Sequence, residues 1–62
     1  MNKDRRKRIR DVISTLEDIQ DEEQDYYDNM PDNLKSSMRA EESENAIENL
    51  SDAISSLEDI FS

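Results

Sequence analysis

Carboxylates are the residues of this chain that could do chemistry. The 62 residues include 17 Asp and Glu but no histidine, cysteine or glycine. Paired carboxylates act as general acid and base only in a concave site that separates their pKa values. The composition leaves out Ser-His-Asp and Cys-His catalysis, histidine and cysteine ligands for zinc, the EF-hand loop and the Gly-rich phosphate loop. We therefore expect no enzyme, no metal site and no cofactor.

The stretch from Glu41 to Phe61 is the clearest element that positions these carboxylates. The unit Ala-Ile-x-x-Leu begins at Ala46 and again at Ala53, and a third copy opens at Ile60. A seven-residue spacing places apolar side chains on one stripe of an α-helix. This stretch is predicted to be an amphipathic helix with one buried face.

A second amphipathic helix is predicted in the first half of the chain. Its apolar positions follow spacings of three and four and then resume after an acidic interruption, at Ile9, Val12, Ile13, Leu16, Ile19, Tyr26 and Met30. Glu22 and Glu23 stand where core residues are expected. The middle of the hairpin is therefore expected to be splayed, partly open to solvent, or reserved for a partner.

The segment Asp28-Asn-Met-Pro-Asp-Asn-Leu34 predicts the turn between the helices. Pro31 disfavours helical geometry at Met30, so the first helix should stop by Asn29. Proline also suits the first position of a short helical turn, with Leu34 packed under the tip, and Ser36 or Ser37 would cap the second helix. Met38 and Ala40 are expected to extend the buried stripe. The prediction is one all-α domain over 1–62, an antiparallel two-helix hairpin with helices at about 3–29 and 37–61 and a turn at about 30–36.

An internal repeat supports the antiparallel arrangement. The nine residues from Asp11 to Ile19 match those from Asp52 to Ile60 at seven positions. The repeats are symmetric about a point between Lys35 and Ser36, where the hairpin turns. They should lie side by side and run in opposite directions, although two acidic heptad helices would also share such a pattern.

Charge is divided sharply along the chain. Residues 1–10 hold six basic side chains against Asp4 alone, a net charge of +5, whereas residues 11–62 carry −14. A basic cluster suggests nucleic acid or an anionic membrane surface. Alternatively, the basic start of the first helix pairs with the acidic end of the second, where each meets opposite charge and the favourable end of a helix dipole. We favour this clamp, because the remaining −14 would repel phosphate.

A single hairpin of this composition buries little apolar surface. The composition is close to that of disordered chains, but the helical spacing of the apolar residues favours folding. The second helix carries about three apolar positions per heptad, more than one neighbour covers, so we expect a homodimer that forms a four-helix bundle. The predicted interface comprises Ile9, Val12, Ile13, Leu16, Ile19, Ile47, Leu50, Ile54, Leu57 and Phe61. No apolar run reaches transmembrane length and no signal peptide follows the basic start, so a cytoplasmic protein without membrane contact is expected.

The run from Leu16 to Leu34, followed by the acidic Ala-Ile-x-x-Leu helix, resembles small acidic helical-hairpin proteins of bacteriophages and prophages of Gram-positive bacteria. The resemblance covers about residues 11–60, and its most specific part is the turn from Asp28 to Leu34. The group is largely without assigned activity, so no site residues carry over. It implies a phage origin, and many small phage proteins bind and block a host enzyme or defence system.

Three functions remain open. The first is a phage-encoded inhibitor of a host anti-phage defence or nucleic-acid-processing protein, which would act in the host cytoplasm, for example as a DNA mimic. Its candidate binding residues are Glu17, Asp18, Asp21, Glu22, Asp25, Tyr27, Asp28, Glu41, Glu44 and Glu48; the same carboxylates would otherwise be a solvated face that keeps a small bundle in solution. The second is a structural or assembly protein that docks through its apolar stripe. The third is a nucleic-acid-binding regulator that uses residues 3–10.

Overall fold

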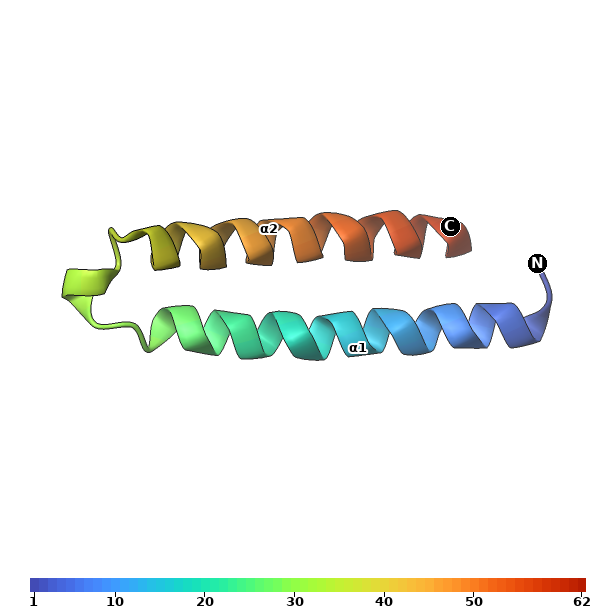
Figure 1. The fold of residues 1–62 in the computed structure, drawn as a ribbon. Coiled ribbons are helices and arrows are strands. Elements are labelled where there is room, and N and C mark those ends of the chain that lie inside the picture. Colours follow the sequence, from blue (N-terminus) through green and yellow to red (C-terminus); the bar gives the residue numbers. More distant parts are fainter.

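Two antiparallel helices of similar length form the molecule. The computed structural model describes residues 1–62 and contains α1 (Lys3–Asp28), a 3-10 turn η1 (Asp32–Leu34), α2 (Met38–Glu58) and a closing 3-10 turn η2 (Asp59–Phe61). Figure 1 shows the helices side by side, with the connection at one end and both termini at the other, where α1 extends beyond α2. The rod measures 49 × 15 × 14 Å. The predicted all-α hairpin is thus confirmed.

Each helix begins at a polar cap. The Asn2 side chain accepts a hydrogen bond from the Arg5 amide at 2.8 Å, which satisfies one of the free N–H groups at the start of α1. The Ser37 hydroxyl accepts from the Ala40 amide and donates to the Leu34 carbonyl. Of the two serines expected to cap the second helix, Ser37 does so.

The connection turns without glycine. Pro31 precedes η1 in an extended conformation, and the Leu34 and Ser37 amides close successive turns on the carbonyls of Pro31 and Leu34. No residue has a positive φ, so every residue type in the turn is compatible with its backbone. Two expectations about this region are wrong. The Leu34 side chain is exposed instead of packed under the tip, and Met38 is 77% exposed, because it lies on the outer side of α2, while Ala40 is buried.

The core of the hairpin is one row of side chains on each helix. In α1 and the residue that follows its cap, the side chains that are not exposed recur at spacings of four and three; they are Ile9, Ile13, Leu16, Gln20, Glu23, Tyr27 and Met30. The matching row on α2 and η2 is Ala40, Ser43, Ile47, Leu50, Ile54, Leu57 and Phe61. These spacings are those of a two-stranded coiled coil. We call these two sets the core rows.

Polar contacts fix the register of the two core rows. The Gln20 amide donates to the Ser51 hydroxyl at 2.6 Å, and the Tyr27 hydroxyl donates to Glu44 at 2.5 Å, seven residues further along α1 and seven residues back along α2. The same register brings Arg10 beside Phe61, and the Arg10 guanidinium carbon lies 4.6 Å from the ring centroid. The repeats that begin at Asp11 and Asp52 therefore lie antiparallel beside each other, as predicted.

The middle of the hairpin is not splayed. Gln20 also donates to the Ile47 carbonyl at 3.1 Å, and the Ser43 hydroxyl donates to Glu23 at 2.8 Å. Glu22, the other acid of the interruption, is exposed. The acidic interruption is thus bridged by polar contacts between the helices.

Neither α1 nor α2 contains an apolar stretch long enough to span a membrane.

Candidate interaction surfaces

The core rows divide the rest of the surface into two opposite sides. Because α2 runs against α1, the positions that immediately follow Leu16 and Ser43, namely Glu17 and Glu44, fall on the same side of the hairpin. The Tyr27–Glu44 and Gln20–Ser51 hydrogen bonds lie on this side. So does a shallow pocket lined by Arg10, Ile13, Glu17, Glu58 and Phe61. The positions that immediately precede Gln20 and Tyr27, namely Ile19 and Tyr26, fall on the other side.

Besides Glu58, six exposed carboxylates lie on the first side. They come from both helices and are Glu17, Asp21, Asp28, Glu41, Glu44 and Glu48. The ion pairs of the structure are Lys7 with Asp11 and Arg8 with Asp4, so none of the six forms an ion pair. The basic residue nearest to the set is Arg10, which lines the same pocket as Glu17. We call this set the acidic face. No group of Asp and Glu side chains is arranged to hold a metal ion.

The ten candidate binding residues do not form a single surface. Six of them make up the acidic face, and Tyr27 lies beside it. Asp18 and Asp25 occupy the outer ridge of α1, opposite α2, and Glu22 lies beyond that ridge. Spacing along one helix could not separate these groups, because the division depends on where the second helix lies.

Tyr27 is tied to the neighbouring helix. Its ring is half-buried and its hydroxyl bonds Glu44, whereas Tyr26 is 49% exposed on the opposite side. The hydrogen bond to Glu44 raises the pKa of Tyr27 above its ordinary value of 10.0, and burial and the negative charges of Glu44 and Asp28 act in the same direction. The exposed ring of the pair is therefore Tyr26, although Tyr27 was the candidate binding residue.

The apolar residues of the predicted dimer interface fall into two groups. Ile13 and Ile54 are buried inside the hairpin, and six more core-row residues are half-buried, namely Ile9, Leu16, Ile47, Leu50, Leu57 and Phe61. Val12 and Ile19 instead are 50% and 45% exposed. These two and Tyr26 form a row at seven-residue spacing immediately before the core row of α1.

The basic start of α1 contacts an aromatic ring in η2, the short turn that follows α2. The guanidinium carbons of Arg6 and Arg10 lie 6.0 and 4.6 Å from the centroid of Phe61, within the range of cation–π attraction. The expected clamp correctly puts the basic start of α1 beside the C-terminal end of the hairpin. However, no ion pair joins the two helices. The sequence predicted only an apolar role for Phe61, so its contact with the two arginines was not foreseen.

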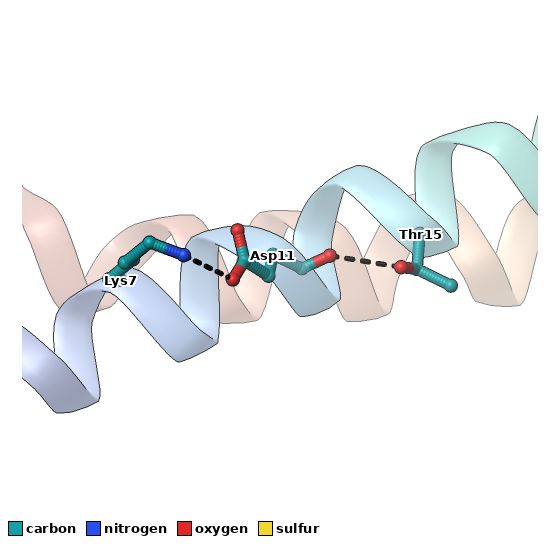
Figure 2. Close-up of polar contacts among 3 residues, drawn as sticks. All are labelled: Lys7, Asp11 and Thr15. Atoms are coloured by element: carbon teal, nitrogen blue, oxygen red, sulfur yellow. Dashed lines mark hydrogen bonds and ion pairs between the residues drawn. The ribbon is translucent and has the colours of Figure 1, made fainter.

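Two basic residues near this end are paired within α1. The Lys7 ammonium lies 3.0 Å from the Asp11 carboxylate, and the Thr15 hydroxyl donates to the Asp11 carbonyl at 3.0 Å. Figure 2 shows both contacts. Arg8 pairs with Asp4 at the same distance. All four charged side chains are well exposed, so these pairs contribute little to stability.

Comparison of the chain with family models, with curated proteins and with solved structures finds no match.

Proposed function

We propose that this chain is a non-enzymatic interaction protein whose acidic face binds a basic surface of a larger host protein. The observation that carries the proposal is that carboxylates from α1 and α2 line the same side of the rod, exposed and without basic partners. A basic groove that normally holds nucleic acid presents Lys and Arg side chains that such a face complements. The protein would then inhibit by occupying that groove.

The rod carries a lower charge density than duplex DNA. Duplex DNA carries one negative charge per roughly 1.7 Å, whereas a net charge of −9 over 49 Å is about one per 5 Å. The attraction is therefore weaker than that of DNA at long range. Selectivity would depend on matching individual basic side chains of the target.

The kind of target is inferred from the resemblance of the Asp28–Leu34 turn and its flanking helices to phage hairpin proteins. We propose a phage-encoded inhibitor of a host defence or nucleic-acid-processing protein in the cytoplasm. An alternative role in phage assembly is favoured by a different observation, the exposed row of Val12, Ile19 and Tyr26. In that role the apolar side, not the acidic face, would contact the target.

Capture of partners from a host lysate with two matched variants tests the proposal. One variant neutralises the acidic face (Glu17→Gln, Asp21→Asn, Glu41→Gln, Glu48→Gln). The control makes four equivalent changes elsewhere (Asp18→Asn, Glu22→Gln, Asp25→Asn, Glu42→Gln), and all eight positions are exposed. We expect the parent chain to capture a nucleic-acid enzyme that added DNA displaces.

The acidic-face variant should lose this capture by about tenfold or more, while the control should retain most of it. Raising the salt to about 1 M, where the screening length is ~3 Å, should release the partner from the parent chain. Capture of a phage structural protein that withstands this salt would instead support the assembly role.

A further inference from the structure

One side of the hairpin carries a row of apolar side chains on each helix, and the fold leaves all but one of them exposed. This surface consists of the row before each core row, on α1 and on α2; the members are Val12, Ile19, Tyr26, Ala46, Ala53 and Ile60. The four large side chains are between 39% and 50% exposed. We call this set the apolar face. It lies opposite the acidic face.

The register arranges the apolar face in three layers. Val12 lies level with Ile60, Ile19 with Ala53, and Tyr26 with Ala46, because the register that pairs Gln20 with Ser51 continues along both helices. Half-buried core residues such as Leu16 and Leu50 lie between the two rows. Three apolar positions per heptad are typical of a helix with two helical neighbours, and each helix here has only one.

The side of the hairpin that carries the apolar face is large enough to seat a second copy of the chain. The whole side measures 49 × 15 Å, about 700 Å², and standard-size interfaces bury about 800 Å² per partner. The three apolar layers from Val12 to Tyr26 occupy roughly 21 Å of this length at about 1.5 Å per residue. Two copies that pack through this side become a four-helix bundle with every acidic face on the outside. No carboxylate of the acidic face is then brought into the interface.

Charge along α1 selects the orientation of the second copy. Residues 1–10 carry +5, and the segment from Glu17 to Asp28 holds seven acids and no basic residue. If the copies point in opposite directions, α1 packs on α1 with the basic third of one beside the acidic half of the other. If they point the same way, both basic ends lie at one end of the bundle.

The end of α1 that extends beyond α2 also favours copies that point in opposite directions. Met1, Arg5, Arg8, Ile9 and Val12 line a pocket on the side of the apolar face, at the end of the hairpin where α1 extends beyond α2. In the opposed arrangement this pocket lies against the turn end of the other copy. In the other arrangement the part of the pocket at Ile9 and Val12 meets the end of the other copy, and the part formed by Met1, Arg5 and Arg8 is left uncovered.

We propose that the chain forms an antiparallel homodimer through its apolar face, with α1 packed on α1, α2 on α2, and the two-fold axis at the layer of Ile19 and Ala53. Across this axis Val12 of one copy meets Tyr26 of the other, and Ile60 meets Ala46. Each small residue therefore faces a large one at the outer layers of α2. The dimer does not rest on the proposed binding of a basic partner, since that binding uses the opposite side.

Single cysteines in a chain that otherwise has none test this geometry directly. Ile19→Cys alone should form disulfide-linked dimers under mild oxidation, because the residue meets its own copy at the axis. A mixture of Val12→Cys and Tyr26→Cys chains should link to each other. Ser14→Cys, exposed on the opposite side of α1, is the control and should not link.

Linkage of Val12→Cys with Ile60→Cys chains in preference to Tyr26→Cys chains would overturn the opposed orientation. That pair meets only when the two copies point the same way. Equal linkage at Ser14 would show random collision and would also count against the interface.

Sedimentation equilibrium tests the dimer without cysteines. The parent chain should sediment as twice 7.3 kDa at micromolar concentration. Ile19→Glu should raise the dissociation constant by about thirtyfold or more, as expected for the loss of an interface residue that contributes ~2 kcal/mol, while Ser14→Glu, with the same charge change, should not. Circular dichroism of the Ile19→Glu chain checks that it remains helical. A helical parent chain that stays monomeric at about 100 μM, or an apolar face that binds only another protein, would overturn the proposal.

Discussion

Tyr26 and Tyr27 are neighbours in the sequence but lie on opposite sides of the hairpin. Tyr27 belongs to the core row of α1 and donates its hydroxyl to Glu44, while Tyr26 lies on the apolar face. The phenol and the carboxylate share one proton-dependent contact, which makes Tyr27 a reporter of whether the two helices are in register.

At this scale we predict that the contact is lost at high pH. The pKa of Tyr27 is higher in the folded chain than in an unfolded one, chiefly because of the hydrogen bond to Glu44. Folding therefore favours the protonated phenol. The stabilisation by this contact is present below the ordinary pKa of about 10 and is lost as the pH rises through the folded pKa.

Ultraviolet absorbance of the phenolate measures this titration in a Tyr26→Phe background, where Tyr27 is the remaining tyrosine. Glu44→Ala should lower the pKa of Tyr27, and Glu48→Ala, an exposed acid one turn further on, is the matched control. Identical titration curves for the two variants would mean that the Tyr27–Glu44 hydrogen bond does not form in solution.

At the scale of the helices, most of the fold could be predicted because it depends on local signals. Apolar spacing identified both helices, Pro31 marked the turn, and the symmetry of the repeats indicated the register. Whether Val12 and Ile19 or Ile13 and Gln20 face the other helix could not be predicted. Both rows are apolar over part of their length, and the choice is made by the packing of α2 against the whole of α1.

Polar residues in the core rows were the other misreading. The apolar pattern predicted that Glu22 and Glu23 interrupt the contact between the helices. In the structure Glu23 accepts a hydrogen bond from Ser43, and Gln20 donates hydrogen bonds to two groups of α2. Ser43 is almost fully buried between the helices. A small serine at a core position of α2, opposite an acid of α1, was the available signal. Such polar residues commonly fix the register of paired helices at some cost in stability.

Replacing the Glu23–Ser43 pair with apolar residues should therefore stabilise the hairpin. The double variant Glu23→Leu and Ser43→Ala removes both polar partners together, so neither is left unsatisfied, and we expect a gain of about 1 kcal/mol in the free energy of unfolding. Glu22→Leu makes the same change at the exposed neighbour and should alter stability by less than about 0.5 kcal/mol. Urea denaturation followed by circular dichroism measures both. A double variant less stable than the parent would show that the pair contributes net stability.

At the scale of the whole molecule, repulsion among carboxylates opposes folding. Residues 11–62 carry −14, and the two ion pairs of the structure lie at the basic end of α1. The attraction of Arg6 and Arg10 to Phe61 at that end is between a charge and a ring, so salt weakens it less than an ion pair at the surface. Screening should consequently reduce repulsion more than it reduces attraction.

We predict that salt stabilises the hairpin. Raising the ionic strength from about 0.01 to 0.15 M shortens the screening length from roughly 30 to 8 Å, and a gain of about 1 kcal/mol would raise Tm by roughly 4 to 8 °C in a domain of this size. Thermal denaturation at several protein concentrations separates this effect from dimerisation, which makes Tm depend on concentration.

Reversal of Arg5, Arg6 and Arg8 to Glu makes the net charge six units more negative. This variant should melt below the parent at low salt, and the difference should shrink as salt is added. If Tm of the parent instead falls with salt, attraction between the basic end and the acidic remainder outweighs the repulsion, and the ends of the hairpin are held by charge after all.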